Sequence, residues 1–578
     1  MTQNKSVISR EWRIRMGADW RERISQPTYK VKVEKDVMVP MRDGVRLAVD
    51  IYRPDADGRF PALLALSPYG KEIQELPLAP QAQGGPLWDG EIEAGDSYYF
   101  VPRGYVHVVA DVRGTGYSEG EYEFLFSPKE QTDGYDLVEW AAKQPWCNGN
   151  VGLVGMSYYG SIQPYVAIQQ PPHLKAIVPV ASSLDLYRDI NYNGGVLGAF
   201  FYGLWDGRGG DSGFAMGNIV SVMERRLGKQ EFVHRIQERL QDPDIQAFSN
   251  FYHLLKYPKK NPMFVDILLN PCDGPFWRER AAYYDIEKIN VPIYIIGAWK
   301  RSYWASTAFS LYNRASTPYK RVLIDPSGWW ERPWVTYYEE NIRWFDHFLK
   351  GIDTGAMEEP PIKIFVKGIN HWRYENEWPL ARTKPTRYFL RSFGGLSPEP
   401  ERYMDAPDPF IQPPLCMTYD IHSVTYQTPP LLHDLEVTGP VALYLYASID
   451  QNDTNWIVKL FDAGERDEQL ARGYLKASHR ALDTARSTSL QPYHTHVDPE
   501  PVLPGKIYEY AIEIQPISNV FRAGHRIKLE IRSLEHGNEG AQGQPPNATH
   551  LCSSKTTLHN IYRNKDYQSH LLLPVIPK

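Results

Sequence analysis

One serine stands in a context that is typical of a catalytic nucleophile. Residues 155–160 read Gly-Met-Ser-Tyr-Tyr-Gly, follow an apolar run and open a segment of helical character that reaches Ala167. A tight strand-to-helix turn holds a hydroxyl at the carboxyl edge of a sheet, where the helix N-terminus and the next backbone N–H stabilise a developing oxyanion. The strict G-x-S-x-G form is broken, because Tyr159 stands where the second glycine belongs. A G-x-S triplet alone is often structural, but this placement predicts that Ser157 is a nucleophile.

The turn requires a sheet, and the apolar pattern predicts one. Residues 37–52 alternate between apolar and charged side chains, as half-buried antiparallel strands do. Short continuous apolar runs follow, separated by helix-length segments; such runs are typical of parallel strands buried on both faces. They cover residues 62–66, 106–112, 151–155, 176–180, 293–297 and 322–324. We therefore expect an α/β core with a mostly parallel sheet.

Two further segments interrupt or follow this core. Between residues 184 and 290 the strand signal fades, and residues 218–227 and 231–240 have helical periodicity with charged faces. An insertion of this kind can cover an active site and exclude water, although it can also be a remote structural elaboration. After about residue 360, alternation dominates and Pro/Gly turns separate the runs, as in an antiparallel sandwich or jelly roll.

Composition limits the classes of function. The chain has 578 residues, too many for a single core, so we expect two or three domains. A net charge of -6 with interspersed signs gives no basic stripe for nucleic acid, and no apolar run is long enough to span a membrane. The first 23 residues contain no apolar core of a secretion signal, so a cytoplasmic location is expected. Four scattered cysteines indicate neither a zinc site nor a disulfide framework, and we expect no metal and no organic cofactor.

Several motifs, in the same order along almost the whole chain, resemble the cocaine esterase and X-Pro dipeptidyl-peptidase family of serine hydrolases. They are Met-Arg-Asp-Gly-Val-Arg-Leu at 41–47, Ser-Pro-Tyr-Gly-Lys at 67–71, Asp-Val-Arg-Gly-Thr-Gly-Tyr-Ser-Glu-Gly at 111–120, Gln-Pro-Trp at 144–146, the serine turn, and Val-Phe-Arg-Ala-Gly-His-Arg at 520–526. The resemblance implies an α/β-hydrolase core in residues 1–183 and 291–358. It also implies a helical cap insertion in 184–290 and a jelly-roll β-sandwich in 359–578.

The resemblance also assigns the oxyanion donors. In this family a tyrosine after the first long parallel strand donates its hydroxyl to the oxyanion, and the residue after the nucleophile donates its backbone N–H. The matching residues are Tyr69 and Tyr158. The alternative for Tyr69 is an aromatic ring that only packs its loop.

The proton relay of the family is absent at the matching positions. The family has an acid in a Gly-Trp-Tyr-Asp-like turn, whereas this chain has Arg301 there, and no Asp or Glu occurs in residues 292–322. The family histidine follows the last strand, and here Trp329 takes its place. Serine is a poor nucleophile without a base. The nearby carboxylates are Asp325 and Glu331; Asp325 could act as the base or could simply cap its loop.

Tryptophans gather where the last two parallel strands are expected to end, which is where α/β proteins bind ligands. We expect Trp299, Trp329 and Trp330, together with Arg301, to contact a small apolar or aromatic substrate. The alternative is that these rings pack against the cap.

Three functions remain open from the sequence. The first is hydrolysis of an ester or amide with Ser157 as nucleophile and Tyr69 and Tyr158 as oxyanion donors. The second is a triad-deficient homologue that uses the pocket for a lyase, isomerase or cyclisation step, and the third is a non-catalytic binding protein. A small-molecule substrate is expected in the first two, and a homo-oligomer is compatible with the jelly-roll surface. Fold analogy alone does not rank these functions.

Overall fold

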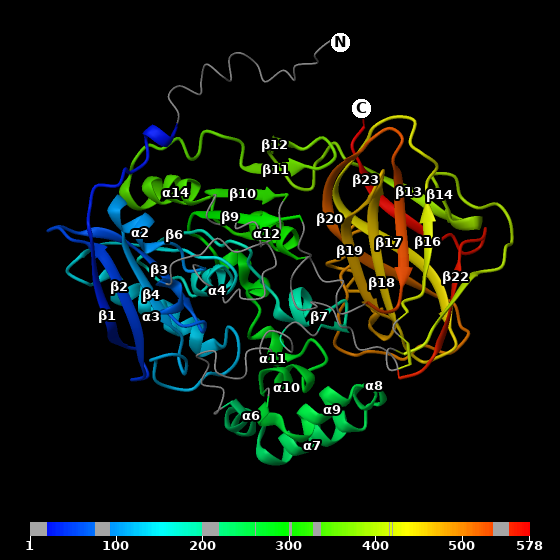
Figure 1. Cartoon of the computed structure of the whole chain (residues 1–578), viewed down its shortest axis with the longest axis horizontal. Coiled ribbons are helices and arrows are strands. Elements are labelled where there is room, and N and C mark those ends of the chain that lie inside the picture. The colour runs from blue at the N-terminus through cyan, green and yellow to red at the C-terminus, as the bar shows by residue number, and fades with distance from the viewer. Residues whose placement is uncertain are drawn as a thin grey trace, which may run out of the picture.

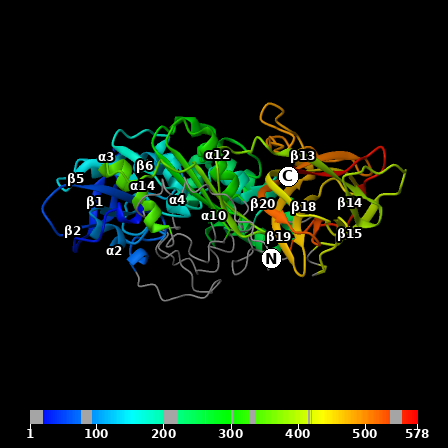
Figure 2. The same cartoon turned by 90° about the horizontal axis from the view of Figure 1, so that it is seen from above.

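The computed structural model describes residues 20–75, 93–198, 201, 219–260, 262–299, 303–326, 337–414, 417–418, 420–535 and 554–577. Figure 1 shows three parts: a sheet with helices on both faces, a β domain beside it, and a group of helices at the foot of the view. Seen from above, the molecule is elongated, with the core at one end and the β domain at the other (Figure 2).

The core is built on a ten-stranded sheet. Its order is β1 (Val31–Pro40), β2 (Arg46–Pro54), β4 (Val106–Asp111), β3 (Phe60–Ser67), β5 (Cys147–Leu153), β6 (Leu174–Ile177), β9 (Ile293–Ala298), β10 (Lys320–Asp325), β11 (Ile362–Val366) and β12 (His371–Glu375). The strands from β4 to β11 are parallel, whereas β1, β2 and β12 pair antiparallel at the edges. The predicted parallel strands are thus present, and they are buried on both faces as their continuous apolar runs require.

Helices cover both faces of this sheet. Side chains of α3 (Pro128–Ala142), α4 (Tyr158–Ala167) and α12 (Trp304–Arg314) join one hydrophobic cluster. Those of α2 (Ser97–Phe100) and α14 (Tyr338–Lys350) join the cluster on the opposite face. The approach of α14 is close, since a Cβ on Gly152 of β5 would lie 2.8 Å from the ring of Phe345.

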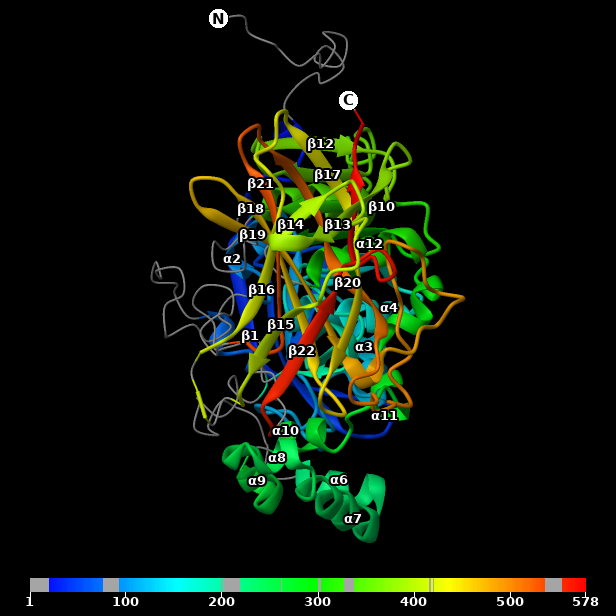
Figure 3. The same cartoon turned by 90° about the vertical axis from the view of Figure 1, so that its right-hand side faces the viewer.

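The chain between β6 and β9 is mostly helical. It contains the helical turn η4 (Tyr187–Asn191), the short hairpin β7 (Tyr192–Asn193) and β8 (Val196–Leu197), and then α6 (Ile219–Leu227), α7 (Lys229–Leu240), α8 (Pro243–Gln246), α9 (Ser249–Lys256), α10 (Pro262–Leu268), α11 (Pro275–Arg278) and η7 (Ala282–Lys288). Helices α6 to α9 form the foot of the molecule in Figures 1 and 3. Their buried side chains, such as Met223 and Phe251, continue the hydrophobic cluster of the core, which ties the insertion to the sheet.

The C-terminal part is an all-β domain, as predicted. Its eleven-stranded sheet has the order β15 (Asp408–Gln412), β22 (Thr557–Tyr562), β17 (Leu435–Ile449), β20 (Tyr508–Phe521), β19 (Asp467–Lys476), β18 (Asn455–Ala463), β21 (Arg526–Arg532), β16 (Ser423–Gln427), β14 (Gly395–Ser397), β13 (Lys384–Arg391) and β23 (His570–Val575). An additional pairing of β17 with β23 closes the sheet around a cluster of its own. The specific jelly-roll topology stays a prediction.

The core sheet continues past residue 358, the predicted end of the core. Strands β11 and β12 lie after that residue, yet β11 pairs parallel with β10 and β12 pairs with β11. Alternation predicts strands but does not say which of two neighbouring sheets they join. Within the described ranges, every helix is too short or too polar to cross a lipid bilayer.

Candidate functional site

Ser157 occupies a strained turn between β5 and α4. Its φ of 59° and ψ of -118° lie outside the regions that non-glycine residues favour, and it is the N-cap of α4. The backbone fixes this turn from both sides: the N–H of Ser157 donates to the carbonyl of Val180 at 3.0 Å, and the N–H of Met156 donates to the carbonyl of Glu93 at 2.8 Å. A strained backbone that is held in place by hydrogen bonds on both sides is typical of a nucleophile elbow.

Two glycines make the turn sterically feasible. Gly155 has a φ of 130°, and a Cβ there would lie 2.3 Å from Cβ of Tyr159. A Cβ on Gly160 would lie 2.1 Å from the carbonyl oxygen of Val180, so the first turn of α4 passes directly against the end of β6. Gly160 therefore provides the close approach that the second glycine of G-x-S-x-G would otherwise provide. This explains why a tyrosine is accommodated at 159.

The two predicted oxyanion donors lie next to each other. The rings of Tyr69 and Tyr158 have centroids 5.7 Å apart in an edge-on arrangement, and Tyr69 also contacts the ring of Tyr159 at 6.5 Å. The N–H of Tyr158 belongs to the first residue of α4, and an N–H at that position has no carbonyl partner within its own helix. Tyr69 is half-buried.

A buried ionic network holds the loop that carries Tyr69. The N–H of Tyr69 donates to Oγ of Ser67, and the N–H of Lys71 donates to Oδ1 of Asp111 at 2.8 Å. Nζ of Lys71, whose side chain is 1% exposed, lies 2.9 Å from Oδ1 of the fully buried Asp50. Burial raises the pKa of Asp111 to about 6, although the N–H of Lys71 opposes this shift. The Ser-Pro-Tyr-Gly-Lys segment at 67–71 is thus anchored on both sides of its tyrosine.

Glu130 is a residue near this site that the sequence motifs did not reveal. Its carboxyl accepts a hydrogen bond from the Tyr158 hydroxyl at 2.6 Å and another from the N–H of Phe126 at 3.1 Å. Full burial raises the pKa of Glu130 to about 8, so the group is mostly protonated at neutral pH. The available signal was the capping pattern Ser-x-x-Glu at the start of α3, where the N–H of Glu130 donates to Oγ of Ser127.

No side chain in the described part of the chain hydrogen-bonds the Ser157 hydroxyl. Two histidines of the described part are paired with carboxylates away from the serine: His173 lies 2.8 Å from Glu139, and His525 lies 2.7 Å from Asp462. His347 lies on α14, where its ring contacts Phe348. Within the described ranges, no group of three or more His, Cys, Asp or Glu side chains could hold a metal ion.

The structure places two further predicted site residues in packed surroundings. The Asp325 carboxylate accepts a hydrogen bond from the hydroxyl of Tyr337, and its backbone carbonyl accepts one from the N–H of Trp299 at 3.0 Å. Trp299 is 4% exposed, donates its indole N–H to the carbonyl of Phe365 at 2.8 Å and packs against Trp378. The structure thus places Trp299 in the core, and a contact of its ring with a substrate stays a prediction. Arg301, Trp329, Trp330 and Glu331 lie outside the described residues.

The parallel sheet, the strained serine turn at its carboxyl edge and the adjacent tyrosine define an α/β-hydrolase. Comparison with known proteins narrows this class. Residues 43–329 match the family model described as X-Pro dipeptidyl-peptidase (S15 family), and residues 354–572 match the X-Pro dipeptidyl-peptidase C-terminal non-catalytic domain. The chain belongs to this S15 family of serine esterases and peptidases, and it is an enzyme of the α/β-hydrolase class.

The relatives cover most of the chain. It is similar to cocaine esterase from Rhodococcus sp. (strain MB1 Bresler), with 27% identity over 94% of this chain and 99% of the relative. It is also similar to Xaa-Pro dipeptidyl-peptidase from Lactobacillus delbrueckii subsp. lactis, with 29% identity over 79% of this chain and 63% of the relative. The crystal structure of a CocE/NonD family hydrolase from Staphylococcus aureus shares the fold, with a TM-score of 0.73 at 23% identity over 94% of this chain and 93% of that one.

Proposed function

We propose that the protein transfers the acyl group of a small ester or amide to Ser157 and then to water. The observation that carries the proposal is the backbone of Ser157: a strained φ of 59° is maintained at the N-terminus of α4, beside Tyr69. A structural serine does not require this conformation, whereas a nucleophile presented at the edge of a sheet does.

In the proposed reaction, Oγ of Ser157 attacks the substrate carbonyl, and the new C–O bond places negative charge on the carbonyl oxygen. The N–H of Tyr158 and the hydroxyl of Tyr69 donate hydrogen bonds to that oxygen. When the tetrahedral intermediate collapses, the bond to the leaving alcohol or amine breaks, and that group leaves with the proton that Oγ of Ser157 has lost. Water then attacks the acyl-enzyme, its oxygen joins the released acid, and one of its protons returns to Oγ of Ser157. Each oxyanion donor is worth about 2.7–4 kcal/mol of barrier.

For the substrate we propose an ester of a small apolar or aromatic molecule. Aromatic side chains gather next to the predicted nucleophile, since Tyr69 contacts both Tyr158 and Tyr159, and Phe126 contacts Tyr158 at 4.6 Å. The relative named cocaine esterase acts on an ester, which supports esters as the first class to test.

Covalent labelling tests the role of Ser157 directly. The whole chain would be treated with a fluorophosphonate probe and with 4-nitrophenyl esters of acetate, butyrate and benzoate. We expect labelling and ester cleavage by the wild-type protein, and neither by Ser157→Ala. Ser316→Ala, which changes an exposed serine of the same core, serves as the matched control and should behave as wild type.

Two results would overturn the proposal: a folded wild-type protein that does not react with the probe, or labelling that persists in folded Ser157→Ala. Circular dichroism and thermal unfolding of each variant show whether the protein is folded.

A further inference from the structure

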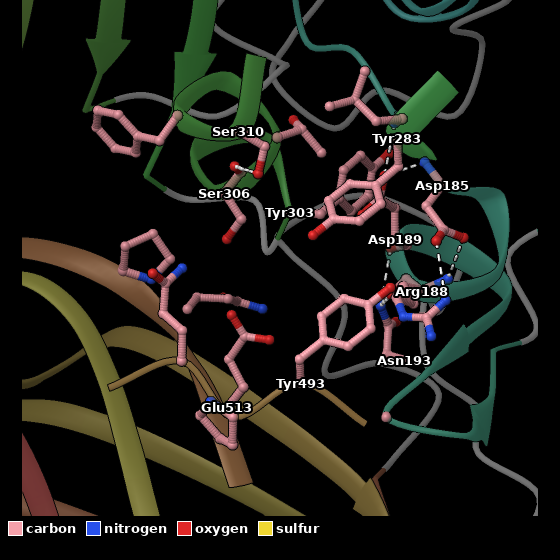
Figure 4. Close-up of a pocket in the computed structure, with 18 of the residues that line it drawn as sticks. Asp185, Arg188, Asp189, Asn193, Tyr283, Tyr303, Ser306, Ser310, Tyr493 and Glu513 are labelled. Atoms are coloured by element: carbon pink, nitrogen blue, oxygen red, sulfur yellow. Dashed lines mark hydrogen bonds and ion pairs between the residues drawn. The ribbon is translucent and has the colours of Figure 1, made fainter. Parts of the chain in front are cut away.

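A separate cavity of about 390 Å³ lies where the core meets the β domain. Its walls come from α12, η4, η7, β19, β20 and the loop around residue 493. Ser157, Tyr69 and Tyr158 do not line it. Its volume falls within the range of small-molecule sites, and the close-up in Figure 4 shows polar side chains reaching into it from both parts of the protein.

The four arginines that line the cavity already have carboxylate partners. Arg188 lies 2.6 Å from Asp273 and 3.1 Å from Asp185. The remaining ion pairs are Arg314–Glu287 at 2.7 Å, Arg486–Asp483 at 3.6 Å and Arg472–Glu535 at 3.6 Å. The cavity therefore offers no uncompensated positive charge among these arginines, which makes it a poor site for an anion.

The three carboxylates that line the cavity are not equivalent. Asp185 is paired with Arg188, and Asp189 accepts hydrogen bonds from the N–H groups of Leu184 and Asp185. Glu513 on β20 has neither a hydrogen bond nor an ion pair within the described part of the chain. Figure 4 shows its carboxylate pointing away from its strand into the space between Tyr493 and Ser306. One carboxylate of the cavity wall is thus left without a hydrogen-bond or ion-pair partner among the described residues.

The rest of the wall suits an organic cation. Tyr283 and Tyr493 stack almost parallel, with centroids 6.0 Å apart and 14° between their planes. The guanidinium of Arg314 lies over the Tyr283 ring at 4.5 Å and that of Arg188 over the Tyr493 ring at 4.6 Å, so these rings already accommodate cations. Ser306 and Ser310 on α12 provide hydroxyl groups on the opposite side. Aromatic faces together with one carboxylate are the groups that bind an ammonium ion attached to an apolar body. The imidazoles of His494 and His496 also line the cavity, and burial lowers the pKa of both, so they add little competing positive charge at neutral pH.

We propose that this cavity binds a small organic ammonium ion, with Glu513 as its counter-ion and the Tyr283–Tyr493 pair as its apolar wall. The site is independent of acyl transfer at Ser157. The side chain of Glu513 is exposed to the solvent of the cavity, but the protein atoms around it raise the pKa of its carboxyl to about 7, and Arg188 opposes that shift. Binding should therefore strengthen as the pH rises from about 6 to about 8, because the carboxyl group ionises in this range while the amine stays protonated.

The probe is 2-phenylethylamine, with 2-phenylethanol as its neutral match, and binding to the whole chain is measured by isothermal titration calorimetry at about pH 8. We expect the amine to bind, and Glu513→Gln to weaken it by about tenfold or more, with little effect on the alcohol. Glu509→Gln is the matched control, since Glu509 is exposed on the same strand and face but does not line the cavity. It should bind as wild type does, and so should Ser157→Ala.

A second variant, Ser306→Leu, keeps the proposal testable if Glu513→Gln does not fold. Ser306→Leu fills the cavity from the α12 side and should abolish binding of both probes. Wild-type protein that does not bind 2-phenylethylamine would overturn the proposal. Equal affinity of wild type and folded Glu513→Gln, or a loss of binding in Ser157→Ala that places the probe at the serine, would do the same.

Discussion

The carboxyl group of Glu130 lies 2.6 Å from the hydroxyl of Tyr158, the residue that follows the predicted nucleophile. This bond connects the N-terminus of α3 with the first residue of α4, so one fully buried pair joins the two helices that adjoin the serine turn. The contribution of this hydrogen bond to the free energy of unfolding can be measured without an activity assay.

Tyr158→Phe should lower the free energy of unfolding by about 1–3 kcal/mol, because it leaves an oxygen of Glu130 buried without its donor. Glu130→Gln should be milder, since the native group is mostly protonated at neutral pH and an amide of the same shape can still accept the bond. Urea unfolding of both variants measures this order. A larger loss in Glu130→Gln than in Tyr158→Phe would show that the carboxyl is ionised instead.

The raised pKa of Glu130 also predicts a pH dependence. The folded pKa of about 8 lies above the unfolded value of about 4.3. The unfolded chain thus loses the proton first, and the stability contributed by Glu130 falls as the pH rises from about 4 to about 8. Unfolding of wild type and Glu130→Gln across this range should show a difference that grows with pH in favour of the glutamine variant. Glu465→Gln, an exposed change, should show no such trend.

Gly160→Ala should be among the most damaging small changes in the core. The new methyl group would lie 2.1 Å from the backbone oxygen of Val180, which cannot move aside as a flexible side chain can. We expect a loss of about 3 kcal/mol or more in unfolding free energy. Gly274→Ala is the control, since its Cβ would have its nearest neighbour at 3.9 Å. Equal melting temperatures for the two variants would contradict the close approach of α4 to β6.

Lys71 and Lys35 allow a matched comparison, because both pair with Asp50 at 2.9 Å. Lys71 is 1% exposed and Lys35 is 38% exposed. Lys71→Ala should cost about 1–3 kcal/mol, because it removes a buried charged hydrogen-bond partner of Asp50 while Lys35 still pairs with that carboxylate, and it should also slow fluorophosphonate labelling by loosening the Tyr69 loop. Lys35→Ala should cost about 1 kcal/mol or less and leave labelling unchanged. Similar costs would mean that the buried pair has no special role.

Asp325 is expected to hold its loop through Tyr337 rather than to act as a base. Asp325→Asn and Tyr337→Phe should therefore lower the melting temperature to a similar extent and leave the labelling rate within a few-fold of wild type. A base would behave differently: labelling in Asp325→Asn would fall by about 10²-fold or more, while Tyr337→Phe remained active.

The fold and the site could be predicted from the sequence where the residues that form a feature are neighbours along the chain. The turn at Ser157 could be placed because an apolar strand, a short motif and a helix follow one another within about twenty residues. A close backbone approach at Gly160 could be expected, but its neighbour Val180 could not be named in advance, since that contact exists only once the chain after β6 lies beside β5. Trp299 illustrates the opposite case: its position after a strand could be predicted, but the packing of its ring against Trp378, far along the chain, could not. The Glu513 cavity combines segments far apart in the chain and has no local signal.

Arg188 links the core to the C-terminal β domain. Its guanidinium pairs with Asp185 and Asp273 on the core side, and it also donates to the backbone carbonyls of His494 and Thr495 in the β domain. Removing the β domain would strip this cation of those acceptors and open its surroundings to water. The C-terminal β domain therefore shields this cation of the core from water, and a core cut free of that domain should be less stable than the same core in the whole chain.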